Sequence, residues 1–320
     1  MGTRDFELKV LGTGAALPAR GRYPSSHLLN VGGTLHMIDC GEGTQERLRE
    51  AAINFQRIAT VFISHLHGDH YLGLMGLLSS MHLMGRTAPI DVFGPAQLKV
   101  IIDIQLQASG TFLRFPFRFH TVPHRTGEVL LDDTKVTVTT LALRHRIPCT
   151  GYLFREKPGP HRLRPEAVHR IPHYLRNAVK AGEDLVLPNG ERVPNAELTL
   201  PPLPARSYAY CSDTAYAPEL VEALQRVDLL YHEATFTETM RARAKETFHS
   251  TAAQAARIAA AADVGHLLLG HFSSRFKSVD VLLDEARDIF PRTSVASEGD
   301  VHKIPSRDPE GIGGSPTFVP

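Results

Sequence analysis

The chain contains 320 residues, of which 42% are hydrophobic, and its formal net charge is +1. This is enough apolar material for one large core or two smaller ones, but no apolar run approaches the roughly 20 residues of a membrane span. Because the charge is nearly balanced, no overall field attracts nucleic acid, and such a partner would need a local basic patch.

The first half of the sequence alternates predicted strands with predicted helices. Apolar residues at alternate positions indicate half-buried strands, and apolar residues three or four positions apart indicate helices. We predict strands at 6–12, 34–40, 58–64 and 135–143, and helices at 44–52 and 71–83. Thr44 is expected to be the N-cap of the first helix.

The second half repeats this alternation. We predict strands at 207–213, 228–234 and 266–272, and helices at 217–227, 251–262 and 279–290. Two halves of mixed strands and helices indicate an α/β protein with sheets inside and helices outside.

Residues 155–204 interrupt the alternation. This segment is rich in proline, polar and charged residues and shows no steady periodicity. A long irregular segment in a compact domain is usually functional or mobile. We therefore expect one domain over residues 1–320, with 155–204 as an inserted arm and not as a domain of its own.

The three cysteines, Cys40, Cys149 and Cys211, are scattered singly along the chain. They show neither the close pairing of a structural zinc site nor the even number of a disulfide framework. Reduced thiols are typical of the cytosol, and the N-terminus lacks an apolar signal core. We expect a soluble, cytoplasmic protein.

The strongest local signal is the run SHLHGDHYLG, which directly follows a predicted strand. His65 and His67 are two positions apart, so on an extended segment they face the same side. Asp69 and His70 follow after a glycine, which permits a tight turn. Four ligand-type residues in six positions fit two metal ions better than one, since one catalytic zinc ion typically takes three protein ligands.

Three more ligand-type residues lie where predicted strands end: His145, Asp213 and His271. Strand ends in a layered α/β fold can converge on one cleft, so we expect these residues to complete the metal site. Taken singly, each has an ordinary alternative. An isolated histidine is more often hydrogen-bonded or on the surface, and Asp213 also fits a turn or a helix cap.

The HLHGDH run, between a strand and a helix, resembles the metal signature of the metallo-β-lactamase superfamily. Other motifs narrow the resemblance: LGTGAALP, IDCGEGTQ, INFQRI, RHRIPCTGY, YCSDT, HEATF and LLGHFSSR. In this order, over nearly the whole chain, they resemble ribonuclease Z, the endonuclease family that trims the 3′ trailer from precursor tRNA. One departure is that Arg20 and Arg22 keep the charge of the family's P-x-K-x-R-N stretch while its asparagine is absent.

The resemblance implies a four-layer αββα sandwich and a role for each ligand-type residue. One zinc ion would be held by His65, His67 and His145, the second by Asp69, His70 and His271, with Asp213 as the bridge. Asp69 would also be the general base, and His249, oriented by Glu233, would donate a proton to the leaving 3′ oxygen. The reaction would be attack of a metal-activated hydroxide on the phosphodiester, leaving a 3′-hydroxyl on the tRNA. The plain alternative for His249 and Glu233 is a helix-start histidine and a structural carboxylate.

The arm supplies the basic patch that the overall charge lacks. Residues 155–180 contain seven basic and two acidic residues, a net charge of +5. Phosphate contacts give most of the sequence-independent affinity for nucleic acid. We expect precursor tRNA to be bound through arm arginines: Arg162, Arg164, Arg170 and Arg176. An ordinary solvated loop is the alternative.

The resemblance further implies a homodimer, and we expect neither DNA nor a membrane as a partner. Two other functions stay open from the residues alone. One is a zinc hydrolase of a different phosphodiester or of a small lactone or thioester, against which the basic arm and HEATF argue. The other is an RNA-binding scaffold without catalysis, against which the complete ligand set argues. The metal is open too, because histidine and aspartate also accept manganese, iron or cobalt.

Overall fold

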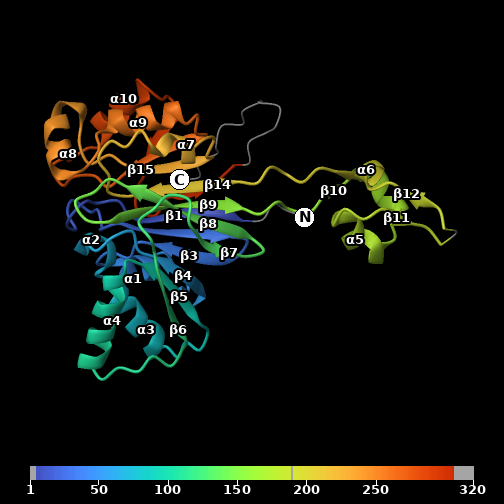
Figure 1. Ribbon diagram of the computed structural model, residues 1–320, viewed down its shortest axis with the longest axis horizontal. Coiled ribbons are helices and arrows are strands. Elements are labelled where there is room, and N and C mark those ends of the chain that lie inside the picture. The colour runs from blue at the N-terminus through green and yellow to red at the C-terminus, as the bar shows by residue number, and fades with distance from the viewer. Residues whose placement is uncertain (1–4, 189, 306–320) are drawn as a thin grey trace.

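The computed structural model describes residues 5–188 and 190–305. Two seven-stranded sheets pack face to face, and helices cover the outer face of each sheet (Figure 1). This arrangement confirms the predicted αββα sandwich. Within the described ranges, no helix combines the length and the apolar character needed to cross a membrane.

The first sheet has the strand order β18-β1-β2-β3-β4-β5-β6. Its strands are β1 (Phe6–Gly12), β2 (Ser26–Val31), β3 (Thr34–Ile38), β4 (Ile58–Phe62), β5 (Ile90–Gly94), β6 (Phe117–Thr121) and β18 (Val301–Lys303). Strands β3 to β6 are parallel, so helices must return the chain between them. The outer face is covered by α1 (Thr44–Glu50), α2 (Gly68–Tyr71), α3 (Leu74–Leu83) and α4 (Ala96–Ala108), with the turn η1 (Phe55–Arg57) before β4.

The second sheet has the strand order β17-β16-β15-β14-β9-β8-β7. Its strands are β7 (Val129–Asp132), β8 (Val136–Leu143), β9 (Cys149–Glu156), β14 (Ser207–Cys211), β15 (Leu229–Glu233), β16 (His266–Gly270) and β17 (Thr293–Val295). The helices on its outer side are α7 (Leu220–Ala223), α8 (Arg241–Thr247), α9 (Ala252–Ala261) and α10 (Asp280–Arg287), with the turn η4 (Glu238–Met240) before α8. The alanines of α9 let this helix lie close to the sheet.

Aromatic side chains fill the space between the two sheets. Phe62 from the first sheet packs against Tyr152 and Phe154 from the second, with ring centroids 5.2 and 5.4 Å apart. Tyr210 and Tyr231 stack on each other at 5.0 Å. The buried Tyr152 hydroxyl donates to the carbonyl of residue 63 at 2.6 Å, so a polar group links the sheets without being left unpaired.

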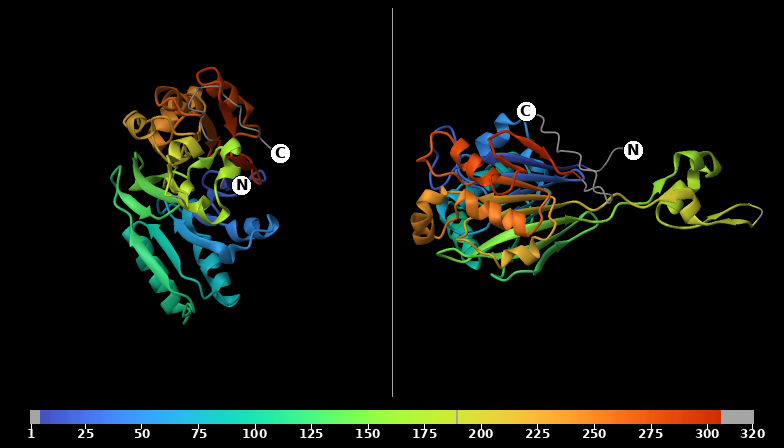
Figure 2. Two further views of the ribbon diagram at one scale, coloured as in Figure 1. Left: turned by 90° about the vertical axis from the view of Figure 1, so that its right-hand side faces the viewer. Right: turned by 90° about the horizontal axis from the view of Figure 1, so that it is seen from above.

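Residues between β9 and β14 form a separate lobe that projects from the body on two extended segments (Figures 1 and 2). Its elements are β10 (Arg162–Leu163), η2 (Pro165–Arg170), η3 (His173–Leu175), α5 (Arg176–Lys180), β11 (Leu185–Val186), β12 (Arg192–Val193), α6 (Asn195–Leu198) and β13 (Thr199–Leu200). The lobe has a small apolar core of its own, which includes Ile171, Val179 and Leu198.

Two details of the helix predictions were wrong. The N-cap of α1 is Gly43, with a φ of +82°, and Thr44 is the first helical residue and donates its hydroxyl to the carbonyl of Gly41 at 2.8 Å. The helix predicted at 71–83 is interrupted at Gly73. A Cβ atom there would lie 2.1 Å from the carbonyl oxygen of Gly41, so only glycine permits this approach.

Several other elements differ from the prediction or were not predicted. The helix predicted at 217–227 is reduced to the single turn α7. Strands β2, β5, β6 and β9 and helix α4 were not predicted. The first six residues of β9 are all buried, so the strand shows no alternation of apolar and polar positions. A run of this kind cannot be recognised by periodicity.

Candidate metal centre

The predicted ligands lie in loops at one end of the sandwich. The HLHGDH run follows β4, and His145 follows β8. Asp213 follows β14 and His271 follows β16, and both strands run parallel to β15 between them. Their carboxyl ends therefore reach the same edge of the second sheet. The structure brings all seven predicted ligand side chains together at this edge.

A first group of ligand atoms comes from His65, His67, His145 and Asp213. The Nδ1 atom of His67 lies 3.0 Å from Nε2 of His65 and 3.1 Å from Nε2 of His145. The Oδ2 atom of Asp213 lies 3.6 Å from His65 Nε2 and 3.8 Å from His145 Nε2. Ligand atoms about 2.0–2.1 Å from one zinc ion lie roughly 3–3.5 Å apart, so this spacing suits one ion.

A second group comes from Asp69, His70 and His271. The Oδ2 atom of Asp69 lies 3.5 Å from Nε2 of His70 and 3.4 Å from Nε2 of His271. The second oxygen of Asp213, Oδ1, lies 3.3 and 3.1 Å from the same two nitrogens. Asp213 thus turns one carboxylate oxygen toward each group, which is the geometry of a bridging ligand.

The chemistry of this donor set fits divalent cations. The Nε2 atom of His70 is buried and has no hydrogen-bond partner among the described residues. Buried polar atoms are normally paired, and a metal ion would satisfy this one. Imidazole nitrogens and carboxylate oxygens bind zinc, and the same donor atoms also bind manganese, iron or cobalt.

Asp39, for which no role was predicted, orients the ligands from the side away from the centre. Its Oδ2 atom accepts hydrogen bonds from Nδ1 of His70 at 2.7 Å and from the hydroxyl of Tyr210 at 2.7 Å. The carboxylate also accepts from the backbone N–H and the hydroxyl of Ser64, at 2.7 and 2.9 Å. Because Nδ1 of His70 donates to Asp39, its Nε2 lone pair points toward the other ligand atoms. We call the seven ligand side chains together the metal cluster.

The other ligand histidines are oriented in the same way. Nδ1 of His145 donates to the carbonyl of Phe248 at 2.9 Å, and Nδ1 of His271 lies 2.9 Å from the hydroxyl of Thr235. His67 differs, because its Nδ1 faces the cluster. Its Nε2 faces outward and lies 3.2 Å from Nη2 of Arg146.

The half-buried His249 and the buried Glu233 form a pair beside the cluster. Nδ1 of His249 lies 2.8 Å from Oε1 of Glu233, which also accepts from the backbone N–H of Thr214 at 2.8 Å. Burial disfavours the charged imidazole, but the Glu233 carboxylate outweighs it and raises the pKa of His249 to about 9. The imidazolium ring stacks on His271 at 5.4 Å, which leaves it at the edge of the metal cluster.

Asp69 is held by the loop that follows β1. The backbone N–H of Ala16 donates to Oδ2 of Asp69 at 2.7 Å, and Ala16 has a φ of +69°. Glu298 fixes this loop by accepting from the N–H and the hydroxyl of Thr13, at 3.1 and 2.7 Å. Burial opposes ionisation of Asp69, but the adjacent His70 holds the pKa of that carboxyl below its usual range, so it is charged at neutral pH.

The four arginines predicted to bind RNA lie in the projecting lobe, at the opposite end of the sandwich from the metal cluster (Figure 1). Two of them also hold the lobe together. Arg162 donates to the carbonyl of Pro201 at 3.0 Å, and Arg176 donates to the carbonyls of Ile171 and Val168 at 3.3 and 3.2 Å. The other two are partly or fully exposed.

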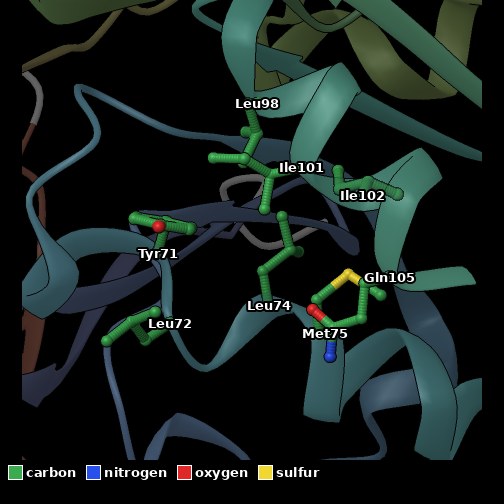
Figure 3. A pocket seen from close by; sticks show the side chains of 8 residues that line it. All are labelled: Tyr71, Leu72, Leu74, Met75, Leu98, Ile101, Ile102 and Gln105. Carbon is green, nitrogen blue, oxygen red and sulfur yellow. The ribbon is translucent and has the colours of Figure 1, made fainter. Parts of the chain in front are cut away.

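An apolar groove of about 180 Å³ lies between α2, α3 and α4, close to the metal cluster in sequence but distinct from it (Figure 3). It is lined by Tyr71, Leu72, Leu74, Met75, Leu98, Ile101, Ile102 and Gln105. None of these side chains is a histidine, cysteine or carboxylate, so the groove offers no metal ligand of the usual kinds.

Three contributors to the site were missed at the sequence level. Asp39 lies at the end of a predicted strand, as Asp213 does, and this placement was an available signal. Arg146 stands next to a predicted ligand, but an arginine in a loop is an ordinary surface residue. The Ala16 N–H carries no signal, because a backbone donor is independent of the side chain.

Comparisons with known proteins find relatives of almost the whole chain. Ribonuclease Z of Bacteroides thetaiotaomicron is 48% identical over 92% of this chain and 93% of its own length. Ribonuclease Z of Phocaeicola vulgatus is 46% identical over 92% and 96%. Among solved structures, the short form of human tRNase Z matches with a TM-score of 0.68 and 27% identity, over 93% of this chain and 99% of that chain.

Two family descriptions match parts of the chain. Residues 6–111 match the anti-Pycsar protein Apyc1, and residues 190–272 match a β-lactamase superfamily domain. The second match includes Asp213 and His271, and the first includes the HLHGDH run. The two matches together therefore include ligands from both sheets.

Proposed function

The chain belongs to the ribonuclease Z family, and from that premise we propose how its residues remove the 3′ trailer from precursor tRNA. A member of this family is a hydrolytic endoribonuclease that processes the 3′ end of tRNA on a metallo-β-lactamase fold. The observation that carries the proposal is Asp213, whose two oxygens face two separate groups of ligand atoms.

The residues of this centre would hold two zinc ions, one in each ligand group. When bound, the ions would lower the pKa of a water molecule toward neutrality and offset negative charge on the phosphate. The residues of the chain then supply the proton transfers. Asp69 accepts the proton of the attacking water, and the Ala16 N–H keeps its carboxylate oriented.

His249 is the proton donor to the leaving oxygen. Its Nδ1 is hydrogen-bonded to Glu233, so the proton on Nε2 is the one available for transfer. As the water oxygen bonds to phosphorus, the bond from phosphorus to the 3′ oxygen breaks, and that oxygen takes the proton. The tRNA leaves with a 3′-hydroxyl and the trailer with a 5′-phosphate.

The proposed role of the arm is to hold the tRNA body through phosphate contacts. Seven basic residues of the arm lie in residues 155–180, whereas residues 181–204 contain Glu183, Asp184, Glu191 and Glu197 and a single basic residue, Arg192. Contacts of this kind recognise the shape of the RNA, and their strength falls with salt.

The direction of β9 supports the proposed homodimer. Cys149, at the start of β9, lies 3.5 Å from a ring nitrogen of the ligand His65. The strand then runs for 8 residues, about 26 Å, before the arm begins. The arm therefore leaves the body far from the metal centre of its own subunit, and projects away from it (Figure 2). In a homodimer, an arm can serve the centre of the partner subunit.

The test is 3′-end mapping of a precursor tRNA that carries a trailer. We expect one cut at the end of the tRNA body, lost with a chelator and reduced at least 1,000-fold in Asp69→Ala, while tRNA binding is kept. Asp103→Ala is the matched control, since Asp103 is an exposed partner of Lys99 on α4.

Two outcomes would contradict the proposal. Unchanged cleavage by Asp69→Ala would remove Asp69 from the mechanism. Failure of the zinc-loaded protein to cut tRNA, with a small chromogenic phosphodiester still hydrolysed, would keep the metal chemistry and assign another substrate.

A further inference from the structure

Arg146 stands at the outer edge of the metal centre, where no carboxylate of the described residues pairs with it. It follows the ligand His145 in the loop from β8 to β9, and its side chain is exposed. Among the described residues, its side-chain contact is with Nε2 of His67, at 3.2 Å. Arg144, two positions earlier in the same loop, forms an ion pair with Glu219. The two arginines of this loop therefore differ in how their charge is balanced.

The contact between Arg146 and His67 changes its nature once a metal is bound. His67 turns Nδ1 toward the ligand nitrogens of His65 and His145. Coordination through Nδ1 requires the ring proton to be on Nε2, which then becomes a donor. A guanidinium is also only a donor. Two donors would face each other 3.2 Å apart, and both would need an acceptor.

We propose that Arg146 and the outward N–H of His67 form a binding subsite for a phosphodiester of the trailer RNA, next to the bond that is cut. This inference rests on the proposed ribonuclease function. A phosphate oxygen can accept from both donors at once, and an arginine bonds phosphate through a rigid fork of N–H groups. Two non-bridging oxygens on one phosphate suit this pair of donors.

The position of His249 assigns the subsite to the trailer side. His249 donates to the 3′ oxygen of the tRNA, so the tRNA end lies on its side of the cluster. His145 packs against His249, with ring centroids 5.3 Å apart, and His67 packs against His145 at 4.9 Å. Arg146 contacts the ring nitrogen of His67 that faces away from this row. The tRNA end and Arg146 are therefore on opposite sides of the ligands.

The first experiment compares Arg146→Gln with the matched control Arg144→Gln on precursor tRNA and on bis(p-nitrophenyl) phosphate. For Arg146→Gln we expect KM for precursor tRNA to rise about 10-fold or more, the loss of one charge-assisted hydrogen bond. The slope of log K for binding against log salt concentration should become shallower by about one, as expected for the loss of one phosphate contact. Turnover of the small diester, which has no neighbouring phosphate, should fall much less than cleavage of precursor tRNA, and Arg144→Gln should resemble the wild type.

The second experiment measures binding without catalysis. The probe is a 5′-phosphorylated trailer oligonucleotide, with either a natural or an uncharged methylphosphonate linkage between its first two nucleotides. The neutral linkage should weaken binding to the zinc-loaded wild type about 10-fold and have a much smaller effect on Arg146→Gln, in which only the His67 N–H remains as a donor.

Three results would overturn the inference: equal loss with Arg144→Gln, equal loss on the small diester, or additive effects of the variant and the neutral linkage. Failure of the proposed function is distinguishable from all of these. It would appear as absent cleavage of precursor tRNA by the wild type, whatever the binding experiment gives.

Discussion

At the residue scale, individual carboxylates set the positions and orientations of the ligand atoms in this centre. Asp213 presents one oxygen to each ligand group, and Asp39 accepts from the nitrogen of His70 that faces away from the cluster. A neutral imidazole has one donor and one acceptor nitrogen, so the partner behind the ring decides which nitrogen can bind a metal. The residues behind the ligands therefore matter as much as the ligands.

The pH dependence of cleavage should depend on Glu233. The proposed proton donor, His249, is charged below its raised pKa of about 9, so the rate should fall above that pH. In Glu233→Gln the carboxylate that favours the imidazolium is gone. The alkaline limb of kcat should therefore move to lower pH by about 1–3 units. The measurement is kcat for precursor tRNA from pH 6 to 10.

Glu246→Gln is the control, because Glu246 is an exposed partner of Arg243 on α8. An alkaline limb that stays in place in Glu233→Gln would exclude His249 as the titrating acid.

The pair of His249 and Glu233 also makes the free energy of unfolding depend on pH. Because the folded-state pKa of His249 is raised, its contribution is complete below about pH 6.5 and is lost as the pH rises through about 9.

At the scale of elements, the buried side-chain amide of Asn195 links several elements of the arm. The side-chain nitrogen of Asn195 donates to the carbonyls of Val179 and Glu183 at 2.6 and 2.8 Å. Its side-chain oxygen accepts from Thr199 at 2.7 Å. These bonds join α5, α6 and β13 around the small apolar core of the arm. A buried amide with several bonds is costly to remove, because its partners are left unpaired.

Asn195→Ala should loosen the arm and spare the metal centre. We expect the arm to lose about 1–3 kcal/mol of local stability, seen as faster hydrogen exchange over residues 162–200. Cleavage of precursor tRNA should weaken mainly through KM, while hydrolysis of the small chromogenic diester should be unchanged. Asn177→Ala, an exposed asparagine of the same arm, is the control. Equal loss on both substrates would mean that the arm supports the body and not RNA binding.

For the whole molecule, the arm lies far from the metal centre of its own subunit. Mixing two variant chains can therefore test whether an arm serves the centre of the partner subunit. One chain carries Asp69→Ala with an intact arm. The other carries Arg162→Gln, Arg164→Gln and Arg170→Gln with an intact centre. Each alone should cleave precursor tRNA poorly. After subunit exchange of equal amounts, the mixture should recover roughly a quarter of wild-type activity, because about a quarter of all centres are both intact and served by an intact partner arm.

The small chromogenic diester is the internal control for this mixture, because it needs a centre but no arm. The arm-variant chain should hydrolyse it at the wild-type rate before and after mixing. No recovery on precursor tRNA, in a mixture shown to contain mixed dimers, would mean that each arm serves its own subunit.

The sequence by itself determined the local chemistry. The HLHGDH run places two histidines on one side of an extended segment because side-chain direction repeats every two residues, a property of the local backbone. Sheets inside and helices outside were predicted because the alternation of strands and helices is also encoded locally, whereas the four-layer αββα sandwich was implied by the family resemblance. The family motifs pointed to the same centre. Where local patterns failed, as in β9 with its first six residues all buried, there was no alternation to detect.

The sequence predicted that strand ends carrying ligand-type residues would converge, but only the tertiary structure decided the contacts between distant groups. His145, Asp213 and His271 reach the cluster because β8, β14 and β16 end at one edge of the second sheet, an outcome of strand order and of packing between the sheets. The same holds for Asp39 behind His70, for the Ala16 N–H and for Arg146. These contacts join residues far apart in the chain, and no short-range pattern specifies them. The end of the body from which the arm departs was likewise set by the direction of β9 in its sheet.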